Sequence, residues 1–146
     1  LKQGEWYFLY FDPAHPWTRI PPNQLIFTGN WNFSPNGDMR TTNTVGASVE
    51  CTFESDAVRW VGRKSDDGGR CMVQIDGKIV RTTDQYDAKK NIAFQQEFRD
   101  LGPGKHAIRL TLLEDKTPAS KDRIVCITGF DIIRTPANQS ATQPAK

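Results

Sequence analysis

The sequence predicts an all-β sandwich, and three observations support that fold class. Short segments of alternating apolar and polar residues recur along the chain, and turn residues separate them. Asp76-Gly77 joins two such segments, and this dipeptide between alternating runs is the strongest short-range indication of a β-hairpin. No segment shows a convincing helical period, because the best candidate, Asn91–Asp100, lacks caps and runs into a Gly-Pro-Gly turn.

Five strands are predicted in the first part of the chain. Gln24–Thr28 opens the series as a short apolar run. Ala47–Glu54 has the clearest pattern, since its apolar and polar residues alternate throughout, as in a half-buried strand. Val58–Arg63 follows after a tight turn. Cys71–Asp76 and Lys78–Arg81 meet at the Asp-Gly turn and form the predicted hairpin.

Three further segments complete a predicted total of eight strands. They are Asn91–Arg99, His106–Leu113 and Arg123–Ile133. Among the tryptophans, Trp60 lies in the middle of a predicted strand, so we expect it in the hydrophobic core.

The two ends of the chain differ from this pattern. Leu1–Pro22 is predicted to be an N-terminal extension or the end of a preceding module, because Trp6–Phe11 is apolar on both faces and several prolines follow. Asn23–Ile133 is the predicted sandwich domain. Arg134–Lys146 has the composition of a linker or tail. Since the chain begins with Leu1 and shows no signal-peptide pattern, we expect a piece of a longer protein.

Composition and charge exclude some classes of function. The 146 residues are 37% hydrophobic and 25% charged, which is typical of a globular domain. A net charge of +2, with acidic and basic residues interspersed, does not indicate nucleic-acid binding. No apolar run approaches the roughly 18 residues of a membrane-spanning helix.

The three cysteines are an odd number, so at least one thiol is free or pairs with another molecule. Cys51, Cys71 and Cys126 each lie in an apolar, strand-like run, and we expect them to act as small buried hydrophobic residues. No Cys-x-x-Cys pair or Cys/His cluster indicates zinc, and the cysteine count leaves the cellular compartment open.

The connections between the strands fall into two groups. In an antiparallel sandwich successive strands point in opposite directions, so alternate connections lie at the same end. Tight connections follow the second, fourth and sixth strands. Long polar connections follow the others, and these are Gly29–Gly46, Lys64–Arg70, Thr82–Lys90 and Glu114–Asp122. Because long loops gathered on a rigid scaffold commonly form a binding surface, we expect a ligand site at their end.

The long loops combine aromatic rings with planar polar groups, and this combination suits a sugar. A ring stacks on the C–H face of a sugar, while forked donors and acceptors pair with its hydroxyls. Acidic and basic residues are nearly balanced in these loops, so they do not favour an anionic sugar. The predicted ligand-binding residues are Trp31, Asn32, Arg40, Asp66, Asp67, Arg70, Tyr86, Lys116 and Lys121. For Trp31 a core position and a sugar platform are both open, as are ligand contact and loop packing for Tyr86.

Six segments carry a resemblance to a known group of proteins. They are Ile26–Trp31, Gly46–Phe53, Val58–Gly62, Val73–Lys78, Leu101–Ile108 and Ile127–Ile132. Their order along Asn23–Ile133 resembles that of the galactose-binding-like superfamily. Leu101–Ile108 in particular resembles the glycine-x-His-x-hydrophobic start of one of the family's strands.

The resemblance implies an eight-stranded antiparallel jelly-roll sandwich that serves as a carbohydrate-binding module. Its ligand would be a polysaccharide or oligosaccharide, and its partner a covalently attached, carbohydrate-active catalytic domain, secreted to an extracellular or periplasmic location. No nucleic-acid or membrane partner is implied. Some modules of this kind hold a structural calcium ion; here Thr128-Gly129 stands where many relatives have Asp, so calcium stays open.

The sequence offers no clear catalytic constellation. Neither His15 nor His106 has a nucleophile motif such as Gly-x-Ser-x-Gly nearby. Asp66 or Asp67 could form a carboxylate pair with Glu114, but acidic residues in exposed loops are usually only solvated. We therefore expect a non-catalytic domain. A structural accessory or spacer domain of a carbohydrate esterase or hydrolase, and a protein-interaction domain, are the alternatives.

Overall fold

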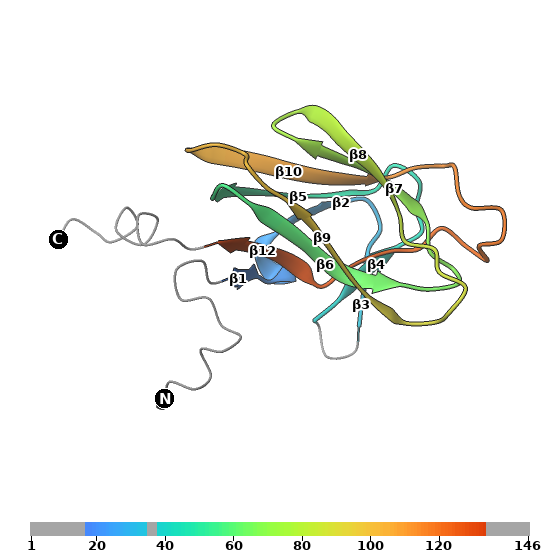
Figure 1. The fold of residues 1–146 in the computed structure, drawn as a ribbon. Coiled ribbons are helices and arrows are strands. Elements are labelled where there is room, and N and C mark those ends of the chain that lie inside the picture. The colour runs from blue at the N-terminus through green and yellow to red at the C-terminus, as the bar shows by residue number, and fades with distance from the viewer. Residues whose placement is uncertain (1–16, 35–37, 134–146) are drawn as a thin grey trace, which may run out of the picture.

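The computed structural model describes residues 17–34 and 38–133, which form the strands of Figure 1 and one 3-10 turn. The strands are β1 (Trp17–Ile20), β2 (Ile26–Thr28), β3 (Asn32–Phe33), β4 (Arg40–Thr42), β5 (Ser48–Glu54), β6 (Val58–Lys64), β7 (Arg70–Ile75), β8 (Lys78–Asp84), β9 (Ile92–Phe98), β10 (Lys105–Leu112), β11 (Val125–Ile127) and β12 (Gly129–Ile133). The turn η2 (Pro22–Gln24) separates β1 from β2. Within the described ranges, no helix has the length and apolar character needed to span a membrane.

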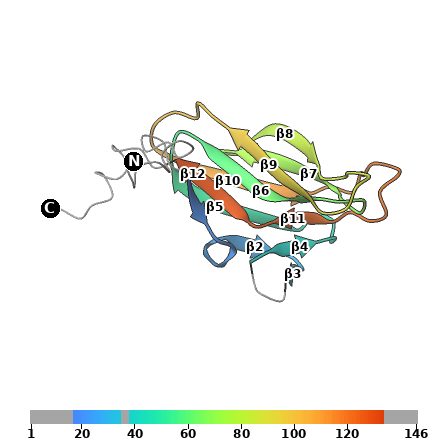
Figure 2. The same cartoon turned by 60° about the horizontal axis from the view of Figure 1, so that its bottom comes forward.

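The strands form two main sheets and a smaller third one. Sheet A has the order β1-β12-β6-β9, sheet B the order β2-β5-β10-β7-β8, and sheet C the order β11-β4-β3. Neighbouring strands in all three are antiparallel. Figure 2 shows β3 and β4 at the bottom of the view, next to β2, with β11, the remaining strand of sheet C, above them. The predicted all-β, antiparallel sandwich is confirmed.

The core lies between sheets A and B. In β5 the buried residues Val49, Cys51 and Phe53 alternate with the more exposed Glu50, Thr52 and Glu54, as the sequence pattern predicted, and Ser48 is buried as well. Trp60 is fully buried, meets the edge of Phe94 at a centroid distance of 4.9 Å, and donates its indole hydrogen to a backbone carbonyl. Its predicted core position is confirmed.

The three cysteines are all buried and unpaired, as expected of small hydrophobic residues. Burial raises the pKa of the Cys51 thiol to about 11, and it raises the pKa values of the Cys71 and Cys126 thiols as well. Thiols protected in this way carry little reactive thiolate at neutral pH.

The structure contains more and shorter strands than the sequence predicted. The predicted loop Gly29–Gly46 contains β3 and β4, and the predicted strand Arg123–Ile133 is two strands that belong to different sheets. The chain changes sheet at Thr128, whose backbone N–H donates to the carbonyl of Val61 at 2.7 Å. Strands of two or three residues are too short to show an alternating pattern, which is why the sequence did not distinguish them from loop.

Strand β1 belongs to the sandwich although the sequence placed it in the N-terminal extension. Trp17 pairs with Ile133 and Arg19 with Asp131, so β1 forms one edge of sheet A. The segment before the predicted boundary at Pro22 therefore supplies part of a sheet. The sequence did not indicate this strand because prolines flank it on both sides. Prolines cannot donate to a strand ladder and occur mainly at sheet edges, so a proline-rich segment does not predict a strand. Residues 1–16 and 134–146 lie outside the described part.

His106 has a structural role at the end of the sandwich that carries the tight turns. Its imidazole is only 8% exposed; Nδ1 lies 2.6 Å from an Asp76 carboxylate oxygen and Nε2 lies 2.9 Å from the Gly102 carbonyl. The hydrogen bond with Asp76 raises the pKa of His106, and the same bond lowers the pKa of Asp76. Asp76 and Gly77 both have positive φ, as the predicted hairpin turn requires.

Candidate functional site

The long loops meet at one end of the sandwich, opposite the end at which β1 begins and β12 ends (Figure 1). Ser65 forms an isolated bridge with Tyr86, and Gly68 forms another with Ile124. The first long loop reaches the last one through Asn43, whose side chain donates to Asp122 at 3.3 Å. The gathering of the long loops, inferred from strand parity, is present in the structure.

Two glycines allow three of these loops to pack backbone against backbone. A Cβ atom on Gly68 would lie 1.9 Å from the carbonyl oxygen of Gln85, and one on Gly69 would lie 2.7 Å from the backbone of Arg123. Gly69 donates to Ile124 O at 2.8 Å and accepts from the Gln85 N–H at 2.9 Å. Gly68-Gly69 is therefore a point of close approach, not merely a turn.

Two buried polar side chains hold this end together. Gln85 is fully buried; its amide donates to the Cys126 carbonyl at 3.1 Å and accepts from the Cys126 N–H at 2.7 Å. Ser120, 4% exposed, lies within 2.7 Å of Gly68 O and 2.8 Å of Asp122 O. Such satisfied buried groups fix the relative positions of the loops.

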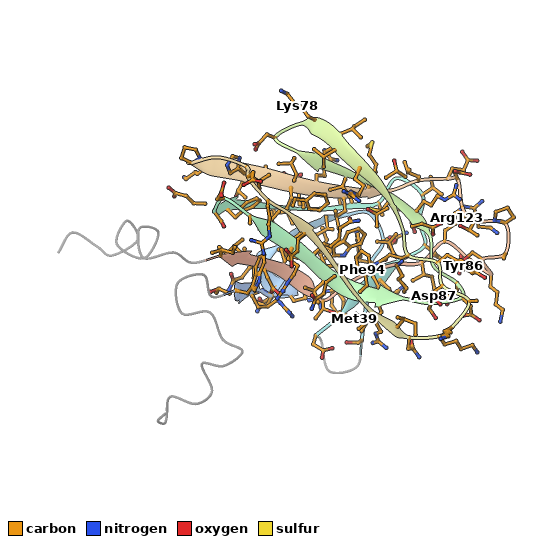
Figure 3. The ribbon with its side chains drawn as sticks, in the orientation of Figure 1. Met39, Lys78, Tyr86, Asp87, Phe94 and Arg123 are labelled. Carbon is orange, nitrogen blue, oxygen red and sulfur yellow. The ribbon has the colours of Figure 1, made fainter. Side chains whose placement is uncertain are left out.

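A pocket of about 190 Å³ opens where these loops meet sheet C and the end of β6. Its lining residues are Met39, Thr41, Arg63, Ser65, Asp67, Gly68, Asn91, Ile124 and Cys126. Figure 3 shows Met39 near the β3–β4 side, and Tyr86, Asp87 and Arg123 at the loop end. Pockets that enclose a drug-sized ligand are usually about 300–1,000 Å³, so this one suits a single sugar ring better than a whole ligand.

Two opposite charges line the pocket without neutralising each other. Arg63 donates to Asn91 Oδ1 at 3.2 Å and to Met39 Sδ at 3.3 Å, but it forms no ion pair with any described residue. The Asp67 carboxylate likewise forms neither an ion pair nor a side-chain hydrogen bond within the described ranges, although its backbone carbonyl accepts from Ile124. Both groups therefore retain hydrogen-bonding capacity for a ligand.

Several of the other predicted loop residues are bonded to groups within the loops. Asp66 and Lys121 form an ion pair at 2.8 Å, which lowers the pKa of Asp66 and raises the pKa of Lys121. Lys116 donates to the Ser120 carbonyl at 2.7 Å. These contacts brace the loops beside the pocket.

Arg70 and Tyr86 also brace the loops. Arg70 bonds Asp115 and lies 3.2 Å from Asp84, and the hydrogen bond with Asp115 raises its pKa. Tyr86 is half-buried, and its N–H donates to Asp84 at 2.9 Å. Neither residue lines the pocket.

The predicted residues of the first long loop divide between the two faces of sheet C. Asn32 pairs in register with Thr41 and so shares the face that lines the pocket. Arg40 lies on the other face, where its guanidinium stacks on Phe33 at 4.0 Å. Trp31 is half-buried against the core, meets Phe27 at 4.9 Å, and donates to the Thr28 carbonyl.

Of the nine predicted residues, Asp67 lines the pocket. The sequence prediction missed Met39, Thr41, Arg63, Ser65, Asn91 and Ile124. Arg63 was predicted as the last residue of a strand. Two signals could have identified it: its side chain alternates to the outer face of that strand, and it lies next to one of the long loops.

The described residues offer little support for a metal centre. No group of three or more His, Cys, Asp or Glu side chains that could hold a metal ion occurs in residues 17–34 and 38–133. Neither is His106 placed for catalysis, and His15 lies outside the described residues.

Solved structures show which class of fold this is. The chain has the β-sandwich fold of carbohydrate-binding modules. The CBM36-1 domain of a multidomain xylanase from the hindgut metagenome of Trinervitermes trinervoides matches with a TM-score of 0.59 and 16% identity, covering 81% of this chain and 96% of that one. A family 35 carbohydrate-binding module from Clostridium thermocellum gives 0.57 and 13%, covering 82% and 98%. A two-domain esterase active on acetylated mannans gives 0.66 and 11%, covering 82% of this chain but 36% of the esterase.

Two enzymes of Flavonifractor plautii are similar in sequence. The A type blood N-acetyl-alpha-D-galactosamine deacetylase is 38% identical over 93 residues, which is 59% of this chain and 12% of the enzyme. The A type blood alpha-D-galactosamine galactosaminidase is 29% identical over 106 residues, or 68% and 10%. The chain thus spans about a tenth of the length of these relatives. No protein-family model matches it.

Proposed function

We propose that this domain is a non-catalytic carbohydrate-binding module that targets an attached carbohydrate-active enzyme to a glycan. The observation that carries the proposal is the pocket in which Arg63 and Asp67, neither of which forms an ion pair with a described residue, lie beside apolar Met39 and Ile124. A carboxylate accepts from sugar hydroxyls, a guanidinium donates to sugar oxygens, and the apolar side chains contact the C–H face. Because the two charges are opposite, this subsite suits an uncharged sugar ring.

The position of the chain ends supports a role beside another domain. Trp17 and Ile133 are paired partners in sheet A, so the described chain enters and leaves at one point. Figures 1 and 2 show that this point lies away from the long loops. A neighbouring domain joined at either side would therefore leave the pocket accessible. Sequence similarity to short parts of two much longer enzymes is consistent with such an arrangement. An extracellular or periplasmic location is part of this proposal.

The alternative is a structural accessory domain without a sugar site. The likeness to about a third of a two-domain esterase favours it, since the matching part of that protein is one portion of an enzyme. The two candidates differ in one outcome: an accessory domain retains its fold but binds no glycan.

Affinity electrophoresis separates them. We expect retardation in gels that contain mannan, xylan or galactan, or binding to arrayed glycans that end in galactosamine or N-acetylgalactosamine. Asp67→Asn and Arg63→Gln should each weaken binding about tenfold, because each removes a charge-assisted hydrogen bond. Glu50→Gln and Arg109→Gln are matched controls, since both residues lie on sheet B, outside the pocket. If correctly folded wild-type protein binds none of these glycans, the accessory role replaces the binding role.

A further inference from the structure

The outer face of sheet A carries a row of charged side chains that the pocket does not account for. In register, Arg19 of β1 lies beside Asp131 of β12, which lies beside Arg59 of β6, which lies beside Glu97 of β9. Paired residues point to the same side of a sheet, and neighbouring residues of one strand point to opposite sides. Trp60, which follows Arg59 in β6, points into the core, so Arg59 and its partners point outward. The row therefore crosses all four strands on the outer side of the sheet.

Part of this row has a purely structural explanation. The side chain of Asp131 is 3% exposed, and it accepts hydrogen bonds from both Arg19 and Arg59. A buried carboxylate requires such partners. One arginine would neutralise it, so the second guanidinium is in excess.

The same face holds further arginines. Arg63 points outward two pairs along β6 from Arg59, at the rim of the pocket. Arg99 follows β9, is half exposed, and pairs with Glu97 at 2.8 Å. The face thus presents four arginines against two acidic residues, of which Asp131 is covered.

The residue type is informative. Every basic side chain in this set is arginine, although the chain contains a similar number of lysines. A guanidinium offers five donors in a planar fork that matches the oxygens of a carboxylate or a sulfate, whereas lysine offers a point charge. The hydrogen bonds of Arg19 to Asp131 use two of its nitrogens, and its side chain is 41% exposed. Donors therefore remain available to a ligand.

An aromatic ring lies at the far end of this face. The guanidinium of Arg59 stacks on Trp17 at 4.3 Å, and that of Arg99 lies 5.4 Å from the same ring centroid. The ring holds both arginines in place, so less side-chain entropy is lost when they bind. From Arg59 to Arg63 the strand rises by about 13 Å, which is longer than one sugar ring.

We propose that the outer face of sheet A binds the anionic groups, carboxylate or sulfate, of a glycan chain whose neutral residue occupies the pocket. The inference rests on the proposed function and specifies its ligand class: a polymer that carries oxyanions beyond the residue held at Arg63. The pocket selects the sugar, while Arg19, Arg59 and Arg99 bind the substituents that follow.

Affinity electrophoresis with three polymers tests this. Partly methyl-esterified polygalacturonate supplies carboxylates beside neutral residues, sparsely sulfated dextran sulfate supplies sulfates beside neutral residues, and galactan supplies neither anionic group. Arg99→Gln and Arg19→Gln should each weaken retention by the favoured anionic polymer about tenfold and leave retention by galactan within twofold. The matched control is Arg109→Gln, on sheet B. Retention that depends on these arginines should fall in about 0.5 M NaCl, because salt screens the interaction.

The outcomes are distinct. Stronger loss with polygalacturonate identifies carboxylate as the bound group, and stronger loss with dextran sulfate identifies sulfate. If Arg109→Gln weakens retention as much as Arg99→Gln, binding is nonspecific ion exchange and the proposal is overturned. If the face variants change nothing while the pocket variants abolish galactan binding, the proposed function stands and this inference falls. If no glycan retards the folded wild-type protein, the proposed function fails first. If Arg19→Gln unfolds because it removes a partner of the buried Asp131, the result for Arg99→Gln alone tests the proposal, since the ion pair of Arg99 is exposed.

Discussion

Replacing Gly68 with alanine tests the packing of the loop end directly. The added Cβ would lie 1.9 Å from the carbonyl oxygen of Gln85, far inside a normal contact of about 3.4 Å, and only 2.7 Å from Tyr86 N. Both are backbone atoms, so no flexible side chain can move aside. The backbone φ of Gly68 is not in the left-handed region, so torsional strain does not contribute. Overpacking costs about 1–3 kcal/mol and occasionally more, and a displacement above 1 Å belongs at the upper end, near 3 kcal/mol.

Gly77→Ala is the matched control, because its φ is +82° and nothing lies within 4 Å of its Cβ position. It should cost only the torsional penalty of about 1–2 kcal/mol. Urea unfolding gives both values, and a melting temperature about 10 °C lower is expected for Gly68→Ala. The pocket, which Gly68 lines, should also lose its ligand in this variant but not in the control. If Gly68→Ala were no less stable than Gly77→Ala, the close approach of the loops would be refuted.

Two other predictions concern stability. Because the pKa of His106 is raised in the folded state, its contribution to the free energy of unfolding is complete below pH about 6.5 and is lost as pH rises through the folded-state pKa. Because the pKa of Asp76 is lowered, its contribution is complete above pH about 4 and is lost as pH falls through the folded-state pKa. The melting temperature should therefore be highest between these values, and Asp76→Asn should reduce the dependence at both ends; an unchanged pH profile would exclude the coupling. Trp60→Ala should cost about 3–5 kcal/mol, and Trp31→Ala about 1–3 kcal/mol with unchanged glycan retention, since Trp31 packs on Phe27. If Trp31→Ala instead lost glycan binding without any loss of stability, Trp31 would be a ligand-binding residue.

The fold class was predictable because its longer strands have an intact period of two. Ala47–Glu54 alternates throughout, and the Asp76-Gly77 turn fixes one hairpin. Strand parity then placed the long loops together, and the bridges of Ser65 and Gly68 agree with that placement. These features depend on local pattern and chain direction, both of which a sequence contains.

The pocket itself was less accessible to sequence analysis. Conspicuous loop charges such as Asp66 and Lys121 neutralise each other, whereas Arg63 and Asp67 do not. Which charges pair depends on distances between loops far apart in the chain. Trp31 likewise could not be assigned before its contact with Phe27 was known. The charged residues of a loop therefore indicate a binding site only after those that form ion pairs with one another have been set aside.

The pairing of Trp17 with Ile133 also has a mechanical consequence. In this antiparallel pair the chain continues outward from both residues at the same end of sheet A, so tension between two flanking domains would pull β1 and β12 apart like a zipper. The ladder bonds would be loaded one after another, which needs less force than shearing them together. The ion pair of Arg19 with Asp131 crosses the two strands two pairs further along and would resist further separation, while Arg59 of β6 ties Asp131 to the rest of the sheet. Under tension from domains on both sides, the edge strand β1 would therefore separate first, while the loop end stays folded.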